Sequence, residues 1–259
     1  MKVVILAGGR GTRLSEETGM VPKPMIEIGG KPILWHIMKI YSHYGYNEFI
    51  ICLGYKGYMI KEYFSHYFSH MSDITIDLVN NKTIIHNTLS EPWKITLVNT
   101  GFDTFTGGRL KRIQSYIKNE SFMMTYGDGV GNVNIKELVK NHKKSKKYVT
   151  LTAVKASERF GILDIKKDKS NILNSFNEKP EITDNWINAG FFVLEPEIFG
   201  YIKGDYTWWE KEPLESLAKN SQVVAYKHSG FWKPMDTLRD KNELEQLWQS
   251  NKALWKLWE

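Results

Sequence analysis

The chain has 259 residues, of which 42% are hydrophobic, enough for one large α/β domain with a substantial buried core. Its formal net charge of +6 suits a nucleic acid, an acidic membrane surface or a polyanionic small substrate. No helix-turn-helix, RNP-like or zinc-finger pattern accompanies that charge, so we expect no nucleic-acid partner. We also expect a cytoplasmic protein with no membrane partner, because the sequence opens directly on a strand-like run and has no apolar run near the roughly 18 residues of a membrane span.

Two features that could suggest other chemistry have plainer interpretations. The single cysteine, Cys52, lies in the apolar run FIICL, where a small buried residue is expected rather than a nucleophile or metal ligand. The dense basic run at 142–147 is expected to be the solvated end of a helix before a strand. The seven histidines are scattered, and none pairs with a second ligand at metal-binding spacing.

The first 147 residues alternate short apolar runs with segments of helical period. This alternation predicts an α/β fold of βαβ units around a mostly parallel sheet. The strands are apolar throughout, as in strands covered on both faces. We expect strands at 2–7, 49–54 and 122–127, and helices at 33–43, 57–68, 109–118 and 135–143.

From residue 148 the rhythm changes to several strands with fewer helices. We expect strands at 148–154, 161–165, 171–176 and 187–194, and helices near 197, at 213–220 and from 237 onward. The organisation predicted is one domain, 1–259, with a first half that has the βα rhythm (1–147), a second half richer in strands (148–236) and a C-terminal helix and tail (237–259). The segment 73–100 interrupts the βα rhythm and is expected to project as a hairpin-like β excursion.

The strongest chemical signal is LAGGRGTRL at 6–14, directly after the first strand. Its glycines let the backbone turn tightly and bring N–H groups against phosphate oxygens. Leu14 stands where a dinucleotide fingerprint has its third glycine, and the Gly-Lys-Ser/Thr ending of a Walker loop is missing. The nucleotide-binding residues predicted in this run are Leu6, Ala7, Gly8, Gly9, Gly11, Thr12 and Arg13.

Two cations support a triphosphate as the ligand of this loop. Arg13 lies inside it, and Lys23 follows in VPKPM, between prolines that stiffen its backbone. A triphosphate needs fixed cations to neutralise the charge that grows on a departing pyrophosphate. We therefore expect Arg13 and Lys23 to be catalytic.

The pattern LAGGRGTRL, followed by PKPM and GGKPIL, resembles the sugar-1-phosphate nucleotidyltransferase family along the whole chain. The stretches EPWKITLVNTG, TGGRLKR, TYGDGV and GFWKPMDTLRDK are similar to the branch that joins CTP to glucose 1-phosphate. The resemblance implies a doubly wound, Rossmann-like nucleotidyltransferase fold, with CTP and glucose 1-phosphate as small-molecule partners. The first half of the domain (1–147) would then bind the nucleotide, and the second half (148–236) would face the sugar.

Two aspartates are candidates for a metal site. Asp128 in TYGDGV comes just after a strand, where open parallel sheets place ligands, and a carboxylate there suits a hard divalent ion. Asp236 in FWKPMDT could instead cap the helix that starts near Thr237. The family resemblance implies that both aspartates bind Mg²⁺, the expected cofactor, and that Asp128 is catalytic.

The resemblance also implies contacts to the two substrates. Among them are Glu178 and Lys179, which the resemblance places at the sugar and its phosphate. The plainer alternative is that these two residues form an exposed ion pair at a turn. An arginine at a helix start opposes the helix dipole, so we expect an anion partner for Arg109. The sugar-facing residues implied are Tyr126, Glu178, Lys179 and Asn188, and the nucleotide-facing ones are Thr104, Gly107, Arg109 and Gly127.

The reaction expected is direct in-line attack by the sugar phosphate on the α-phosphorus of CTP, without a protein nucleophile. Three alternatives stay open: the same reaction with UTP, dTTP or another sugar, a regulatory subunit that only binds a nucleotide sugar, and an NAD-dependent oxidoreductase. Leu14 and the lack of a catalytic Tyr-Lys pair disfavour the oxidoreductase.

Assembly is the last expectation. The excursion carries alternating apolar residues such as Ile74, Ile76, Ile84, Ile95 and Leu97, more than a two-stranded ribbon hides by itself. The resemblance implies a homo-oligomer, a hexamer in size, with this segment in the interface. The tryptophan-rich tail either joins that interface or packs on its own chain.

Overall fold

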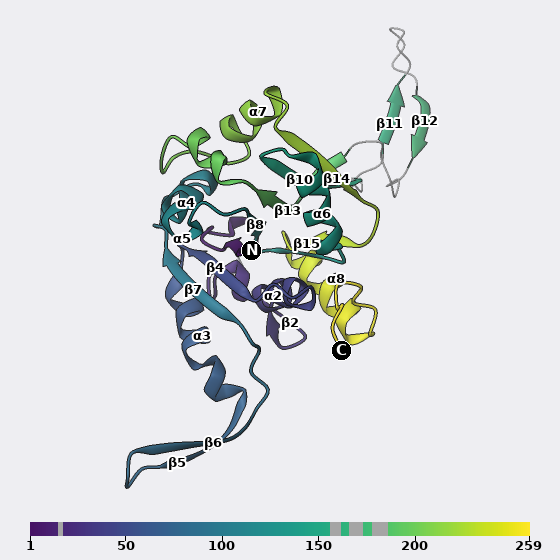
Figure 1. Cartoon of the computed structure of the whole chain (residues 1–259). Coiled ribbons are helices and arrows are strands. Elements are labelled where there is room, and N and C mark those ends of the chain that lie inside the picture. The colour runs from purple at the N-terminus through teal and green to yellow at the C-terminus, as the bar shows by residue number, and fades with distance from the viewer. Residues whose placement is uncertain (15–17, 156–161, 166–172, 178–185) are drawn as a thin grey trace.

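A seven-stranded sheet forms the centre of the protein (Figure 1). A computed structural model describes residues 1–14, 18–155, 162–165, 173–177 and 186–259. The strand order is β14-β10-β13-β8-β1-β4-β7. The strands are β1 (Val3–Leu6), β4 (Glu48–Leu53), β7 (Lys94–Asn99), β8 (Phe122–Tyr126), β10 (Val149–Lys155), β13 (Trp186–Leu194) and β14 (Val223–His228).

Most neighbouring strands are parallel, as the sequence predicts. β1 pairs in parallel with both β4 and β8, β4 with β7, and β10 with β14. Only β13 runs the other way, antiparallel to β8 and β10. The carboxyl ends of β1, β4, β7 and β8 therefore meet at one edge of the sheet, the place where α/β proteins bind ligands.

Helices cover both faces of the sheet because each strand buries its side chains alternately on two sides. Val3 and Ile5 face a core that includes Trp255, whereas Val4 and Leu6 face a second core that includes Trp209. The helices are α2 (Ile33–His43), α3 (Gly57–His70), α4 (Thr106–Arg112), α5 (Gln114–Ile117), α6 (Ile135–Ser145), α7 (Glu212–Lys219) and α8 (Leu238–Gln249).

Short elements complete the chain. The helix expected near 197 is a 3₁₀ helix, Pro196–Tyr201, and two further 3₁₀ turns span Thr12–Leu14 and Lys23–Met25. Small antiparallel pairs join β2 (Glu27–Ile28) to β3 (Lys31–Pro32), β9 (Gly129–Gly131) to β15 (Trp232–Pro234), and β11 (Ile162–Ile165) to β12 (Leu173–Asn177).

The expectation that all of 73–100 projects is wrong for its last part. β5 (Ser72–Asp77) and β6 (Lys82–Thr88) form a hairpin that extends away from the body of the protein (Figure 1). β7 returns to the central sheet, where it pairs with β4 and half-buries Ile95 and Leu97. Alternation alone could not separate the two cases, because an edge strand with one covered face has the same pattern as a free ribbon.

The tryptophan-rich tail packs on its own chain. Trp255 is fully buried, and its ring lies near His36, Phe231 and Trp248. Trp258 packs edge-on against Trp35 of α2. Of the two alternatives for the tail, the structure therefore favours packing within the chain.

Two smaller expectations are confirmed. Cys52 is fully buried, and burial raises the pKa of its thiol to about 12, which makes it a poor nucleophile. The basic run at 142–147 ends α6 just before β10, with Lys143, Lys144 and Lys146 exposed as expected, whereas its first residue, His142, is buried. Among the residues that the structure describes, no helix is both long and apolar enough to cross a membrane.

Candidate functional site

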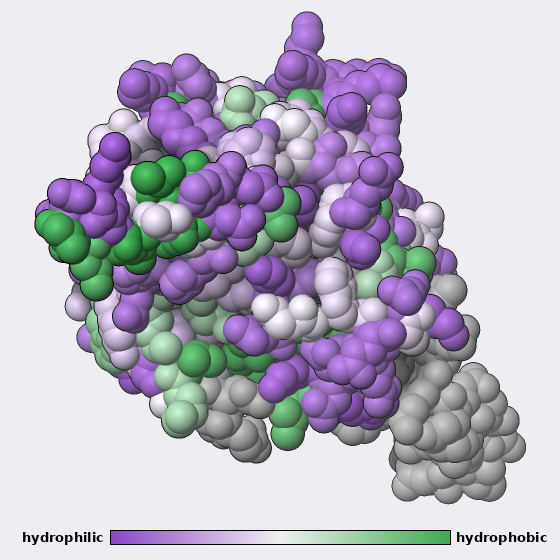
Figure 2. Space-filling model, turned by 90° about the horizontal axis from the view of Figure 1, so that it is seen from below, coloured by the Kyte–Doolittle hydropathy of each residue, from purple (hydrophilic) through white to green (hydrophobic). Residues whose placement is uncertain are grey.

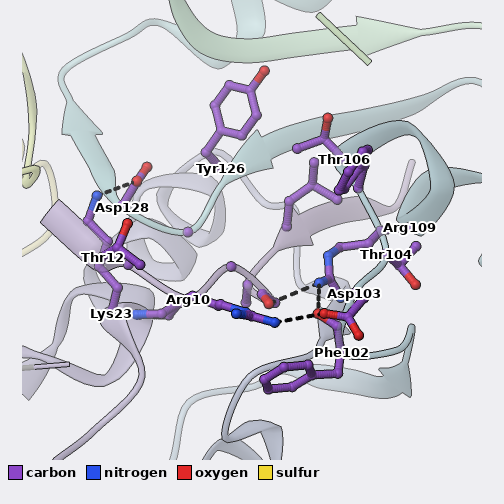
Figure 3. A pocket seen from close by; sticks show the side chains of 18 of the residues that line it. Arg10, Thr12, Lys23, Phe102, Asp103, Thr104, Thr106, Arg109, Tyr126 and Asp128 are labelled. Carbon is purple, nitrogen blue, oxygen red and sulfur yellow. Dashed lines mark hydrogen bonds and ion pairs between the residues drawn. The ribbon is translucent and has the colours of Figure 1, made fainter. Parts of the chain in front are cut away.

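A cavity of about 780 Å³ opens at the carboxyl ends of β1 and β8 (Figure 3). The Gly-rich loop after β1 forms one wall, and the segment from Phe102 to Arg109 forms another. Most of the predicted ligand-binding residues line it: Leu6, Ala7, Gly8, Gly9, Gly11, Thr12, Lys23, Thr104, Arg109, Tyr126, Gly127, Asp128 and Asp236.

Two glycines of the loop meet steric demands that no other residue would. A Cβ on Gly8 would lie 2.3 Å from the Arg109 Nη1 atom, so this position must stay bare for the guanidinium to pass. Gly11 has φ of +64°, in the left-handed region, and its Cα faces the side chains of Thr18 and Lys23. The Thr18 hydroxyl donates to the carbonyl oxygens of Gly11 and Leu14. The sequence thus folds the loop tightly around Lys23.

A short β-ribbon brings the two aspartates together. Asp128 directly precedes β9, Asp236 follows β15 after one residue, and the two strands are antiparallel, with Gly129 opposite Pro234. The Met235 N–H also donates to the Asp128 carbonyl at 2.8 Å. The geometry therefore requires that both carboxylates stand at the same end of the ribbon.

Both carboxylates converge on one cation, the ammonium group of Lys23. Its Nζ lies 2.7 Å from Asp128 Oδ2 and 2.8 Å from Asp236 Oδ1. Burial of Lys23 opposes its charge, but the two carboxylates, Asp128 first, outweigh this and raise the pKa of Lys23 above its usual value. The ammonium stays charged at neutral pH and holds the two acidic side chains side by side.

The capping alternative for Asp236 is wrong. Thr237 is the N-cap of α8, and its hydroxyl accepts a hydrogen bond from the Asp240 N–H at 3.2 Å. In return Asp240 Oδ2 accepts from the N–H groups of Asp236 and Thr237, at 3.1 and 2.9 Å. This capping box fixes the Asp236 backbone and leaves its carboxylate directed toward Lys23.

The donor set fits a magnesium ion. Mg²⁺ is usually held by one or two carboxylates, with waters and substrate phosphates completing the shell. Asp128 and Asp236 already close around a cation, the Lys23 ammonium. No group of three or more acidic, His or Cys side chains forms a cage in the described part of the chain, so the substrate would have to supply the remaining oxygens.

Arg109 does not have the surroundings expected of it. α4 begins at Thr106, so Arg109 is not at the helix start. Its Nη1 donates to the carbonyls of Leu53 and Gly101 and to the Thr100 hydroxyl, at 2.8–3.0 Å, and its Nη2 donates to the Gly8 carbonyl at 3.0 Å. Burial lowers the pKa of this guanidinium. Arg109 thus ties the Gly-rich loop to the ends of β4 and β7 at the wall of the cavity.

This arrangement gives a prediction for stability. We expect Arg109→Lys to lower the free energy of unfolding by about 2–4 kcal/mol, because an ammonium cannot replace the planar fork that joins the carbonyls of Gly8, Leu53 and Gly101 through several charged hydrogen bonds at once. Urea unfolding measures the change. Arg112→Lys is the matched control, since Arg112 is half-exposed in an ion pair with Asp205 and should cost under about 1 kcal/mol. Equal losses in the two variants would contradict the role of Arg109.

Tyr126 lies in the cavity, whereas the other residues expected to contact the sugar are placed differently. Asn188 is exposed and does not line the cavity, and its side-chain oxygen accepts from the Gly190 N–H at 2.9 Å. Glu178 and Lys179 lie outside the described residues, as does the side chain of Arg13.

Gly107 was expected to face the nucleotide, but it serves packing. A Cβ there would lie 2.7 Å from the Thr207 carbonyl, and the Gly107 N–H donates to that same carbonyl at 2.9 Å. Gly107 does not line the cavity. Its small size lets the segment 204–211 dock on α4.

Sequence reasoning missed a group of residues at the mouth of the cavity. Arg10 pairs with Asp103 at 2.7 Å and lies over the Phe102 ring, and Phe105 stacks on Trp208 with 4.5 Å between ring centroids. Arg10 lies within LAGGRGTRL and Thr106 begins TGGRLKR, but the other positions belong to no motif that the sequence analysis identified. The residues missed are Arg10, Phe102, Asp103, Phe105, Thr106, Tyr206 and Trp208.

Known proteins are similar to this chain in sequence, and solved structures are similar to it in fold. A glucose-1-phosphate cytidylyltransferase of Salmonella typhimurium is 56% identical over 260 residues, covering all of both chains. A probable glucose-1-phosphate cytidylyltransferase of Bacillus subtilis is 44% identical over 261 residues, again with full coverage.

Solved structures agree on the architecture. HddC from Yersinia pseudotuberculosis superposes with a TM-score of 0.69 at 25% identity, covering 95% of this chain and 99% of that one. A UDP-glucose pyrophosphorylase complexed with UDP-glucose has the same TM-score at 17% identity, covering 96% and 98%, and supports the fold alone. Residues 2–233 match the nucleotidyl transferase family model, and the chain therefore belongs to the nucleotidyl transferase family.

Proposed function

We propose that this protein transfers a cytidylyl group from CTP to glucose 1-phosphate, giving CDP-glucose and pyrophosphate. The observation that carries the proposal is the pair of carboxylates closed on Lys23 beside a Gly-rich loop, an arrangement suited to a metal-bound triphosphate. The choice of substrates rests on the full-length likeness to the glucose-1-phosphate cytidylyltransferase of Salmonella typhimurium. We place the reaction in the cytoplasm.

In this mechanism the protein aligns two phosphates and neutralises charge. A phosphate oxygen of glucose 1-phosphate forms a bond to the α-phosphorus of CTP, while the bond from that phosphorus to the bridging oxygen breaks and pyrophosphate leaves. The attacking phosphate is already ionised at neutral pH, so no protein base or nucleophile is required. Mg²⁺ held by Asp128 and Asp236 would supply charge stabilisation for the phosphate oxygens.

The residues of the chain divide this work. Backbone N–H groups of the Gly-rich loop bind phosphate oxygens. Lys23 has three N–H donors, and with two directed to carboxylates one is left for the leaving pyrophosphate. Arg13 adds charge from the same loop. Tyr126, Glu178, Lys179 and Asn188 are proposed to hold the sugar and its phosphate.

A pyrophosphate-release assay tests the function. CTP, UTP, dTTP and GTP are each combined with the 1-phosphates of glucose, galactose and mannose, and we expect CTP with glucose 1-phosphate to give the highest kcat/KM. If pyrophosphate is released faster with a different pair, the proposed substrates are wrong but the proposed type of reaction stands. Binding of CDP-glucose without any release would indicate a regulatory subunit, and a change in nicotinamide absorbance would indicate an oxidoreductase.

We also propose a closed homo-oligomer whose interface uses the β5–β6 hairpin. The hairpin keeps apolar side chains in solvent, with Leu78 86% and Val79 92% exposed at its tip. Figure 2 views the molecule from the side on which the hairpin projects and shows hydrophobic side chains at the surface among hydrophilic ones. Such residues on a projecting ribbon are typical of a contact surface.

Light scattering tests the assembly. We expect the intact protein to have several times the mass of one chain, and a variant in which residues 78–81 are replaced by Asn-Gly to dissociate at least partly, because the tip loses its apolar contacts. A monomeric intact protein would contradict the oligomer, and an unchanged mass in the variant would place the interface elsewhere.

A further inference from the structure

One carboxylate beside the cavity has no part in the mechanism above. Glu210 lies in the segment 204–211, just before α7, and both of its side-chain oxygens accept hydrogen bonds from hydroxyl groups. The Tyr126 hydroxyl donates to Oε1 and the Thr106 hydroxyl donates to Oε2, each at 2.6 Å. Within the described residues, no cation lies within ion-pair distance of Glu210.

The direction of these hydrogen bonds is fixed. The Thr106 oxygen already accepts from the Trp209 N–H at 2.9 Å, so its own hydrogen is the one directed to Glu210. A carboxylate can only accept, so the Tyr126 hydroxyl must also donate.

The Tyr126 ring is also held in place. A Cβ on Gly190, where φ is +79°, would lie 2.5 Å from the ring, so the ring packs directly on bare backbone. In Figure 3 the hydroxyls of Tyr126 and Thr106 lie on one side of the cavity, away from Arg10 and Phe102. With its proton committed to Glu210, the Tyr126 oxygen has only its lone pairs left to accept hydrogen bonds, and the side chain of Asn188 lies within hydrogen-bond reach of the same hydroxyl.

We propose that Glu210 is a positioning residue for sugar recognition: it commits the Tyr126 hydroxyl as a donor, so that Tyr126 presents only an acceptor to the ligand and selects a sugar hydroxyl that donates. The proposal rests on the proposed function, in which Tyr126 faces the sugar. It adds Glu210 to the sugar site and states that, in the hydrogen bond between Tyr126 and the sugar, the sugar hydroxyl is the donor.

A purely structural role for Glu210 is already filled by other contacts. The segment 204–211 is fixed to α4 by backbone bonds from Phe105 N–H to the Asp205 carbonyl and from Gly107 N–H to the Thr207 carbonyl, both at 2.9 Å. Arg112 adds a two-point ion pair with the Asp205 carboxylate, at 2.8 and 2.6 Å. The segment is therefore held whether or not the Glu210 side chain is charged.

The test compares Glu210→Gln with Tyr126→Phe and with Asp205→Asn, which loosens the same segment through a contact outside the cavity. We expect Glu210→Gln to lower kcat/KM for glucose 1-phosphate about 5- to 50-fold while the KM for CTP changes less than about threefold. Asp205→Asn should change neither by more than about twofold. Thermal unfolding of each variant verifies that the fold is retained.

Fluorinated sugars supply a readout that a structural role would not move. Fluorine accepts a hydrogen bond weakly and cannot donate one, so among the 2-, 3-, 4- and 6-fluoro analogues of glucose 1-phosphate the wild-type enzyme should reject one strongly. Tyr126→Phe and Glu210→Gln should both lose that discrimination. The losses caused by the two single variants should not add up in the double variant, because Glu210 acts through Tyr126.

Three results would overturn the proposal. They are equal acceptance of all four analogues by the wild type, equal losses for CTP and the sugar phosphate in Glu210→Gln, and the same kinetic profile in Asp205→Asn. If wild-type protein prefers another sugar 1-phosphate, the proposed substrate is wrong, and the same variants assayed on that sugar and its fluoro analogues decide the role of Glu210.

Discussion

Replacing either carboxylate of the pair, as Asp128→Ala or Asp236→Ala, is expected to reduce kcat by about two to four orders of magnitude, since a metal ion bridging phosphates supplies several kcal/mol of charge stabilisation. The fold should persist, because Lys23 keeps one ion pair in each variant. Steady-state pyrophosphate release at saturating Mg²⁺ measures the loss.

Two further measurements make this result specific. Asp205→Asn, a change to a surface carboxylate outside the cavity, should keep kcat within about twofold of the wild type. Mg²⁺ together with CTP should raise the unfolding temperature of the wild type but not of Asp128→Ala, because ligand binding stabilises only a protein that retains the site. A variant that keeps more than about a third of wild-type activity would show that its carboxylate is not a metal ligand.

The second large effect is expected for Lys23→Ala. Its proposed partner is the leaving pyrophosphate, so kcat/KM for CTP should fall by about 10²- to 10³-fold, the usual cost of losing one charge-stabilising donor. CDP-glucose has no pyrophosphate group to contact Lys23, so its affinity should change much less. Kinetics with CTP and calorimetric binding of CDP-glucose give the two numbers.

Lys23→Ala should also separate two roles of the ammonium. Without it, Asp128 and Asp236 lose the cation that both of them contact, so the unfolding temperature should fall in the absence of metal and recover when Mg²⁺ is added. Lys39→Ala is the matched control: Lys39 pairs with Glu91 at 2.7 Å, outside the cavity, and should lower stability without recovery by Mg²⁺. Equal losses for CTP and CDP-glucose would assign Lys23 to the phosphate that stays.

Local sequence patterns predicted much of the fold and part of the site. The Gly-rich loop, Lys23 and Asp128 could be placed because each follows a strand or a proline-stiffened turn, and parallel strands end at a common edge. The pairing of Asp128 with Asp236 needed a likeness to known enzymes, since the ribbon that joins them consists of two three-residue strands with no pattern of their own.

The contacts that the sequence did not predict share a physical cause. Within the chain, Arg109 donates to backbone carbonyls of Gly8, Leu53 and Gly101, which carry no side-chain signal in a sequence. Glu210 was missed because its partners, Tyr126 and Thr106, come from distant segments. What a side chain contacts across the fold is set by packing, and periodicity reports only which face it occupies.

The β9–β15 ribbon has a consequence for biosynthesis. Lys23 meets Asp128 across 105 residues of chain and Asp236 across 213, and the second contact exists only after β15 has been made and paired. A nascent chain that has released the Gly-rich loop, and even Asp128, from the ribosome still lacks a complete charge cluster. Because domains fold as the chain emerges, the charge cluster is completed only when β15 and Asp236 have been synthesised. A chain terminated before β15 would therefore lack one of the two carboxylates that contact Lys23.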